Sequence, residues 1–391
     1  MRIAVGALYA ALLIIETGCV SPGVLAAQAD APEPLCHPGR FAKSETDTLA
    51  VATACHFYHG KDYGTEAQFN PMSEIVNEGF DQLRNDFANR KISELRLEAG
   101  AHNVLEDLLH PISAMRVDGI GRNWRNELLP LSIKSTGGGQ WVPNYEFHLI
   151  GSGMISERMV EWYEAHDIPH PVALSAITMM AAHFLNEDVE DGGRTVPYYR
   201  FDPVADLYVF DIGGILLFRS GRVQNFFSSN TVELTNWPVQ PTLSFPGGTL
   251  ENSGQEFMLR ARLPRTDMFR AFFAFGISTL GGISYGPKGA VAVSVAAGAD
   301  AIDNPIIDPA TGRRTVTLKP NIGFFVDRDG SLLFSVTART SNETVAFANV
   351  YPGVLRFGGH TFGLWTQALK SGRWRFGIVS SNGLGIGSNA R

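Results

Sequence analysis

The stretch TVTLKPNIGFFVDR, residues 315–328, alternates between two kinds of side chain. In an extended chain one face carries apolar residues and the other carries polar residues. The apolar set is Val316, Leu318, Ile322, Phe324 and Val326, and the polar set is Thr315, Thr317, Lys319, Asn321 and Asp327. Because successive side chains of a strand point to opposite faces of its sheet, this pattern predicts a strand with one bulky apolar face.

Similar runs fill the C-terminal part of the chain, and turn sequences such as Gly286-Pro287-Lys288-Gly289 separate them. Eight runs are recognised, at residues 255–263, 269–285, 289–302, 315–328, 331–340, 344–357, 360–369 and 374–387, with a further short strand at 242–245. The connections leave no room for crossover helices, so the strands are expected to be antiparallel. The pattern predicts a β barrel or meander of about eight strands.

Two functions are consistent with this pattern, and they differ in the direction in which the bulky apolar faces point. A membrane barrel turns its apolar side chains toward lipid, whereas a soluble lipocalin-like barrel turns them inward around a ligand. The small residues Ala274 and Gly276 oppose bulky neighbours and suit a narrow interior, and Tyr285 and Trp374 lie near strand ends. The terminal Arg391 is unusual for a bacterial outer-membrane barrel. We therefore predict lipid-facing strands and keep the carrier as the alternative.

Helical spacing precedes the strands, and several apolar stretches carry internal polar residues. The predicted helices lie at residues 71–88, 101–116, 143–166, 170–191 and 203–218. Each apolar stretch is shorter than the 18 or so charge-free residues expected of a transmembrane helix. We interpret them as helices that bury polar side chains against one another.

Two of these helices carry residues that could bind a metal ion or act in acid–base chemistry. His183 and Glu187 are four apart and share one helical face, and His148 lies on another helix. If those faces oppose, His148, His183 and Glu187 form a candidate catalytic set of two imidazoles and a carboxylate. Four residues are candidates for supporting or base roles: Asn144, Glu190, Asp206 and Asp211. The alternative is a polar seam in which these residues hydrogen-bond helix to helix.

The N-terminus resembles an export signal. The apolar run at residues 3–15 is shorter than the about 20 residues that span a bilayer. Cleavage after Ala29 and lipidation at Cys19, a lipoprotein signal, are both possible. Either one leaves Cys36 and Cys55, which in an oxidising periplasm predict a disulfide worth roughly 3 kcal/mol. A zinc site that adds His37, His56 and His59 is the alternative.

Composition limits the class of protein. The 391 residues carry a formal net charge of −7, which disfavours nucleic acid as a partner. A hydrophobic fraction of 45% and a charged fraction of 18% exclude a disordered chain and a polytopic helical membrane protein. No cofactor is strongly implied by the residues, and any cofactor or metal is unknown.

The helical middle region loosely resembles uncharacterised bacterial envelope proteins. In them a W-x-x-N-x-x-x-H-x-x-x-G helix precedes a helix of small residues with an acidic end, and a D-L-x(5)-G helix follows. The matching residues here are Trp141, Asn144, His148, Glu187 with Glu190, Asp206-Leu207 and Gly213, with Ser152 in place of the motif's glycine. The resemblance covers about 80 residues, leaves the strands unexplained and implies no activity.

The sequence thus predicts an α+β fold in four parts. These are an export signal (1–29, or a lipoprotein signal ending before Cys19), a loop-rich segment with the cysteine pair (30–70), a helical subdomain (71–230) and an antiparallel β barrel (231–391). The predicted function is a noncatalytic outer-membrane protein of the bacterial envelope, with the helices as accessory or plug and the membrane as partner. The alternatives are an envelope hydrolase or lipid-modifying enzyme using the His/Glu site, and a periplasmic lipocalin-like carrier of an apolar lipid ligand.

Overall fold

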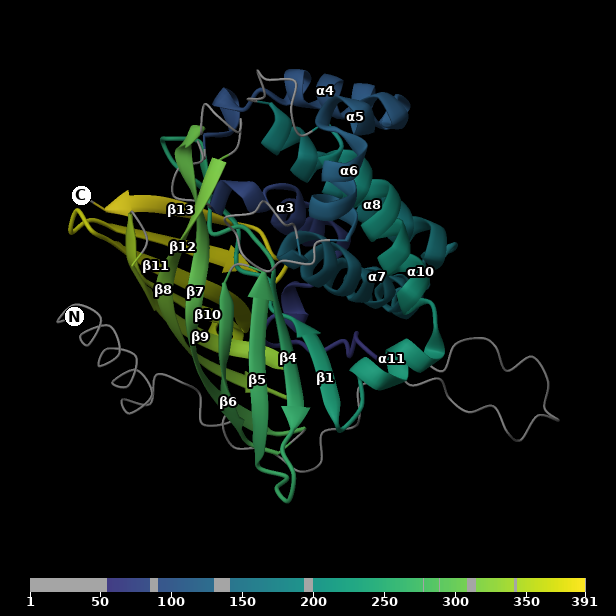
Figure 1. Cartoon of the computed structure of the whole chain (residues 1–391). Coiled ribbons are helices and arrows are strands. Elements are labelled where there is room, and N and C mark those ends of the chain that lie inside the picture. Colours follow the sequence, from purple (N-terminus) through teal and green to yellow (C-terminus); the bar gives the residue numbers. More distant parts are fainter. Residues whose placement is uncertain are drawn as a thin grey trace.

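The computed structural model describes residues 55–84, 91–129, 141–192, 200–276, 278–287, 289–307, 314–340 and 343–390. Helices come first along the chain and strands follow, so the predicted α+β class with an N-terminal helical part is confirmed. Figure 1 shows the strands forming one curled sheet, with the helices gathered on one side of it.

All the strands of the described chain belong to one sheet. In spatial order they are β1 (Val232–Asn236), β4 (Glu256–Arg262), β5 (Phe269–Gly276), β6 (Thr279–Tyr285), β7 (Val291–Ile307), β8 (Arg314–Arg328), β9 (Ser331–Arg339), β10 (Thr344–Phe357), β11 (His360–Leu369), β12 (Trp374–Ser380), β13 (Gly385–Ala390), β2 (Thr242–Ser244) and β3 (Thr249–Glu251). Neighbours are antiparallel, as predicted, except that β13 pairs with β2 in parallel. The sheet is therefore mixed.

The prediction of a barrel of about eight strands is not confirmed. The sheet has thirteen strands, and among the described residues its edge strands β1 and β3 do not pair with each other. Two predicted runs each contain a hairpin: residues 269–285 form β5 and β6, and residues 374–387 form β12 and β13. Gly276 ends β5 with a φ of 117°, which glycine adopts without strain. With five and three residues, β1 and β3 are too short to give a periodic signal.

The two faces of the curled sheet differ in composition. On the outer face Val295, Leu318 and Ile322 are between 58% and 60% exposed. Their strand neighbours Ser294 and Asn321 are almost completely buried on the inner face. The bulky apolar face predicted for residues 315–328 is thus the outer face of the sheet.

The inner face holds its own core. Side chains of Trp237, Met258, Phe272, Phe325 and Tyr351 pack together, although they come from strands as far apart as β4 and β10 and from the loop after β1. Such contacts require the sheet to curl around them. Ion pairs occupy the same face, so the interior is partly apolar and partly charged.

The helical part contains α-, 3₁₀- and π-helical segments. They are η1 (Glu66–Gln68), α3 (Pro71–Gly79), η2 (Asp81–Arg84), η3 (Ile92–Glu94), α4 (Leu97–Leu109), α5 (Pro111–Asp118), α6 (Ile120–Asn123), η4 (Trp124–Leu128), η6 (Trp141–Ser152), α7 (Gly153–Ala165), α8 (Pro171–Asp191), α9 (Asp202–Val204), η7 (Ala205–Asp211), α10 (Ile212–Phe218) and α11 (Gly221–Phe227). Proline residues begin α3, α5 and α8, because the first turn of a helix does not need their missing N–H. Segments η4, η6 and η7 are π-helical, a rare form that often marks functional sites.

The helices pack on the outer face of the first strands. Phe257 in β4 contacts the helical core, whereas its neighbour Met258 points to the inner face. Phe275 in β5 and Leu234 in β1 join Phe257 against Met154 and Met159 of α7. The apolar outer face is therefore covered by helices over β1 and β4 and exposed farther along, on β6 to β8.

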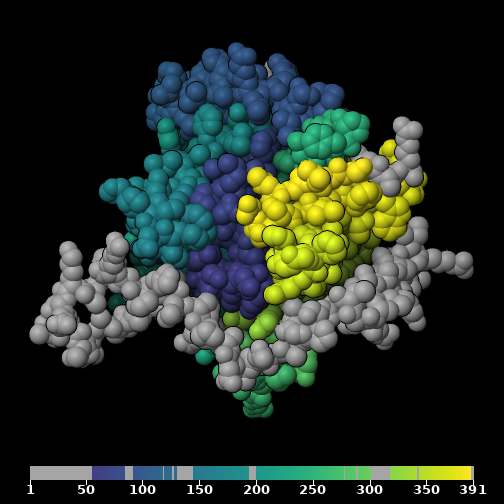
Figure 2. Space-filling model, turned by 180° about the vertical axis from the view of Figure 1, so that it is seen from behind, coloured from purple at the N-terminus to yellow at the C-terminus, as the bar shows by residue number. Residues whose placement is uncertain are grey.

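The first described residues join the two parts of the molecule. Figure 2 shows this segment, in purple, between the teal helices and the yellow C-terminal strands. The backbone N–H groups of Phe57 and Tyr58 donate to the carboxylate of Glu161 in α7. The N–H of Gly64 donates to the carbonyl of Pro352 in β10. This segment ties α7 to the far side of the sheet.

Several predictions fall on residues 1–54, which lie outside the described residues. The export signal, lipidation at Cys19 and the Cys36–Cys55 disulfide therefore stay predictions. In the alternative zinc set, His56 lies beside Glu161 instead, with 3.6 Å between Nδ1 and Oε1. Within the described residues, no helix is both long enough and apolar enough to cross a membrane.

Candidate functional site

Close approach of two helical segments creates the site. A Cβ atom on Gly214 of α10 would lie 2.7 Å from the carbonyl oxygen of Leu149, and one on Gly153 would lie 2.9 Å from the carbonyl oxygen of Gly214. Only glycine permits this contact without a shift of the backbone. It holds η6, which carries His148, against η7, which carries Asp211.

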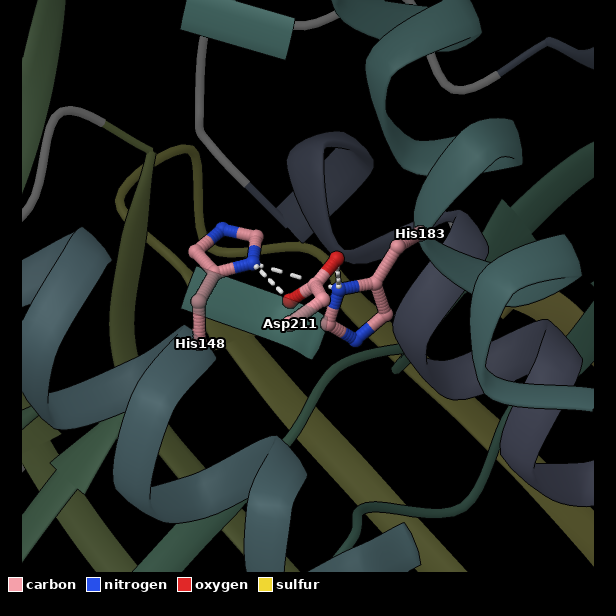
Figure 3. A group of neighbouring side chains, drawn as sticks. All are labelled: His148, His183 and Asp211. Atoms are coloured by element: carbon pink, nitrogen blue, oxygen red, sulfur yellow. Dashed lines mark hydrogen bonds and ion pairs between the residues drawn. The ribbon is translucent and has the colours of Figure 1, made fainter. Parts of the chain in front are cut away.

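Asp211 bridges the two histidines. Its Oδ1 atom lies 2.9 Å from His148 Nδ1, and its Oδ2 atom lies 2.6 Å from His183 Nδ1. The two Nδ1 atoms are 3.2 Å apart. Figure 3 shows both rings turned toward the same carboxylate, with His183 supplied by α8. All three side chains are buried, so bulk water does not weaken these contacts.

The other ring nitrogens also face carboxylates. His183 Nε2 lies 3.0 Å from Glu78 Oε1 of α3, and His148 Nε2 lies 3.6 Å from Asp206 Oδ2 of η7. Glu78 and Asp206 are buried, and each keeps one carboxylate oxygen without a hydrogen-bond partner. A buried polar atom without a partner is costly, so these oxygens indicate that the centre is electrostatically incomplete.

Charge and burial shift the pKa values of the central groups. Burial alone would lower the pKa of His183, but the carboxylates of Asp211 and Glu78 outweigh it and raise the pKa well above its usual value. Burial acts to raise the pKa of Asp211, but His183 and His148 outweigh it and lower the pKa. Asp211 is therefore held as a carboxylate between two imidazoles.

Glu187 and Asp206 form a second acidic pair beside His148. Ligand atoms of Glu187, Asp206 and His148 all lie within 4.8 Å of one another. Burial and the carboxylate of Asp206 raise the pKa of Glu187 well above its usual range. Burial, with Asp202 and Asp211 nearby, does the same for Asp206. This side of His148 concentrates negative charge when both groups ionise.

The structure brings together most of the residues predicted from sequence, in changed roles. His148 and His183 face one another, which was the condition on which the candidate set depended. Asp211, predicted as a supporting or base residue, contacts both histidines directly, whereas Glu187 lies on the far side of His148.

Two predicted supporting residues lie outside the centre. Asn144 is buried, and its Nδ2 donates to the carbonyl of Glu127, so it joins η6 to η4. Glu190 is exposed and accepts a hydrogen bond from Gln82. Asn144 and Glu190 therefore contact neither histidine among the hydrogen bonds and ion pairs of the described residues.

Sequence reasoning missed the acids of α3. In the helix predicted at 71–88, Ile75, Val76 and Phe80 recur at helical spacing, a pattern that favours a buried apolar face. Instead α3 buries its polar face, including Glu74 and Glu78, completely. The available signal is the i, i+4 spacing of those two acids, which places them on one face of the helix. A pair of surface acids has the same spacing, so the sequence does not distinguish the two cases.

The donor set defines what the centre can do chemically. Two imidazole nitrogens and one carboxylate around a single point are ligands typical of zinc and other divalent transition-metal ions. The same groups can exchange a proton between histidine and aspartate. The nearby hydroxyl of Ser152 donates to the carbonyl of Phe147, so it is not directed at either histidine.

Comparison with protein families, curated proteins and solved structures finds no match to the chain.

Proposed function

We propose that this protein is an exported bacterial envelope protein whose curled sheet lies in the outer membrane, with the part of its outer face that the helices leave exposed turned toward lipid. In this proposal the helical part is an accessory region that packs on the sheet without itself crossing the membrane. The observation that carries the proposal is the distribution of side chains between the two faces of the sheet.

The exposed outer face is apolar over adjacent strands. Ile283 of β6 pairs with Val295 of β7, and Ala297 of β7 pairs with Ile322 of β8. Ile378 of β12 pairs with Ile386 of β13, the latter 65% exposed. Monomeric soluble proteins rarely expose a contiguous apolar surface of this kind, whereas lipid-facing sheets require one.

Strand ends and lengths support the same proposal. The rings of Phe269 and Tyr285 pack together at one end of the β5–β6 hairpin, with 5.0 Å between their centroids, and both are exposed. Aromatic residues at strand ends are typical of the membrane–water interface. Strands β7, β8 and β10 have 17, 15 and 14 residues, more than the about 9–11 needed to cross a bilayer.

The inner face of the sheet does not resemble the apolar ligand cavity of a lipocalin-like carrier. It holds buried ion pairs, such as the one between Arg260 and Asp327. The cavity beside Trp237, Phe325 and Tyr351 has a volume of about 80 Å³. Charged side chains, Glu251, Glu256 and Arg339, line part of this space, which does not suit an apolar lipid chain. These features favour the outer-membrane proposal over the lipocalin-like carrier.

The enzyme alternative rests on the buried centre alone. Ser152 and Ser156 near His148 both donate their hydroxyl hydrogens to backbone carbonyls. Since a nucleophile needs a base within hydrogen-bond reach, we propose no reaction for this centre.

Fractionation of the expressed protein tests the proposal. We expect it in the outer membrane, released only by detergent, with a gel mobility that changes on boiling. Val295→Arg should destabilise the inserted protein by about 2–4 kcal/mol, because a charge at mid-membrane is costly. Ser371→Arg, in the exposed β11–β12 turn, is the control and should insert normally. A soluble monomer without detergent would overturn the proposal, and a lipid co-purifying with that monomer would favour the carrier.

A further inference from the structure

The strongest unassigned feature is the set of buried groups around His148 and His183. The ion pairs that Glu78, Asp206 and Asp211 make in the described part of the chain are all with these two histidines. Acidic groups thus outnumber basic ones where water is excluded. A buried excess of carboxylates is costly unless a cation or a bound proton compensates it.

The spacing of the three central side chains matches coordination geometry. Zinc binds imidazole nitrogen at about 2.0–2.1 Å, so two such ligands at a tetrahedral angle lie roughly 3.3 Å apart. The Nδ1 atoms of His148 and His183 are 3.2 Å apart. The oxygens of Asp211, at 2.9 and 2.6 Å from those nitrogens, lie close enough for a small inward adjustment of the ligands around one ion.

Hydrogen bonding by protons alone accounts less well for this spacing. Asp211 accepts from both rings only if each Nδ1 carries a hydrogen. Each Nδ1–H group would then donate to a different oxygen of the carboxylate, but the two donor nitrogens would lie only 3.2 Å apart and repel one another. A metal ion between the two nitrogens would replace both hydrogens. The short distances among the two Nδ1 atoms and the Asp211 oxygens would then be distances between ligand atoms of that ion.

The outer partners of the histidines also fit a metal centre. A metal-bound histidine usually donates its second ring N–H to a carboxylate, which fixes the ring and increases its basicity. Glu78 Oε1 faces His183 Nε2 at 3.0 Å and Asp206 Oδ2 faces His148 Nε2 at 3.6 Å, so each carboxylate lies where a small adjustment would let it accept such a bond. The unpartnered Glu78 Oε2 and Asp206 Oδ1 are an independent sign, because both residues are more than nine-tenths buried.

We propose that His148 Nδ1, His183 Nδ1 and Asp211 bind one divalent transition-metal ion of the zinc class, with Glu78 and Asp206 orienting the two imidazoles. Since π-helical segments η6 and η7 supply His148 and Asp211, the metal also joins helices that come from separate parts of the chain. This proposal is independent of where the protein resides.

Metal binding by the full-length, tag-free protein tests the proposal. The protein is treated with a chelator in mild detergent and then titrated with Zn²⁺, and Co²⁺ serves as an optical probe of coordination. We expect one ion per chain, a rise in melting temperature with Zn²⁺, and Co²⁺ absorption typical of nitrogen and oxygen ligands. Lack of binding by folded wild-type protein at 100-fold molar excess of Zn²⁺ would overturn the proposal, whatever the variants do.

Variants identify the ligands. His183→Ala and Asp211→Asn should lower Zn²⁺ affinity by roughly 100-fold or more, and Glu78→Gln by about 10–100-fold. His166→Ala is the control, because that exposed ring stacks on Trp162 away from the centre. Circular dichroism checks that each variant folds, and His183→Gln replaces His183→Ala if the latter does not. Unchanged affinity in the ligand variants, or loss only in Glu187→Gln, would contradict the assignment.

Discussion

The sheet and the helical part both bury charged residues, but they balance them differently. Inside the sheet each buried arginine faces an acid: Arg260 binds Asp327 and Arg270 binds Glu233. In the helical part Glu78, Asp206 and Asp211 share only two histidines.

The difference teaches that burial of charge alone is not a sign of function. In a bidentate arginine–carboxylate pair the two charges balance and hydrogen-bond each other, so a structural role is enough to account for the pair. The helical centre lacks such a partner and keeps unpaired oxygens, so it requires an additional cation or proton. Breaking each kind of arrangement should therefore have different consequences.

The largest effect is expected where a complete pair is broken inside the sheet. Asp327→Asn leaves Arg260 buried with a weakened partner, because its guanidinium then faces a neutral amide. The free energy of unfolding should fall by about 3–5 kcal/mol, measured by urea unfolding in detergent. The double variant Arg260→Met, Asp327→Leu should recover most of this loss, since neither charge remains buried.

The control is an exposed ion pair between Arg262, at the end of β4, and Asp267, in the turn that follows. Asp267→Asn removes the partner of Arg262, and both of those side chains are largely exposed. The change should cost less than about 1 kcal/mol, because water screens the interaction. Equal losses for Asp327→Asn and Asp267→Asn would contradict the view that the inner pair is stabilised by burial.

The stability of the protein is expected to depend on pH because α3 buries the acidic residues Glu74 and Glu78 side by side. Burial and the neighbouring Glu78 raise the pKa of Glu74 to about 8, against the smaller opposing effects of Arg158, His183 and the hydrogen bond from Gln255. Folding therefore favours the protonated form, so stability is full below the unfolded pKa of about 4.5 and falls as the pH rises toward 8. Glu74→Gln should remove this fall, worth about 4 kcal/mol between pH 5 and pH 9.

Unfolding measured from pH 5 to pH 9 compares Glu74→Gln with wild type. The control is Glu98→Gln at an exposed position of α4, which should keep the wild-type pH dependence. A Glu74→Gln variant that loses stability with pH as steeply as wild type would rule out Glu74 as the cause.

A smaller effect is expected from the glycine contact that assembles the centre. Gly214→Ala places a Cβ atom against the carbonyl of Leu149 and pushes η6 away from α10. The stability cost should be about 1–3 kcal/mol, and Zn²⁺ affinity should fall with it, because His148 moves relative to Asp211.

Gly221→Ala is the matched control for this steric effect. A Cβ atom on Gly221 of α11 would meet no atom within 4 Å. The variant should therefore be neutral or slightly stabilised, as alanine favours the helix over glycine. If both glycine variants lose Zn²⁺ affinity equally, the close contact is not what positions the histidines.

Prediction from the sequence succeeded where the signal is periodic and local. The alternation in residues 315–328 separates the exposed Leu318 and Ile322 from the buried Asn321 and Asp327. The helical spacing likewise placed His183 and Glu187 on one face of α8, and both are buried. Both results depend on which face of an element a residue occupies, which follows from 2.0- and 3.6-residue periods.

The features that the sequence did not predict depend on contacts between residues that are distant in the sequence. The parallel pairing of β13 with β2 joins Gly385 to Thr242, and nothing near either residue signals it. The buried acids of α3 likewise depend on α8 and Gln255 to cover them. The direct role of Asp211 follows from the Gly153–Gly214 contact, a three-dimensional fit rather than a spacing.

The pairing of β2 with β13 also sets an order of assembly. β2 lies between β13 and β3, so the β2–β3 hairpin can join the sheet only after the last strand of the chain has been synthesised. Until then Thr242, Leu243 and Ser244 remain without their main-chain partners in β13. A chain shortened before Gly385 should leave this hairpin detached and open to proteases, which makes completion of the C-terminus the step that commits the protein to its final form.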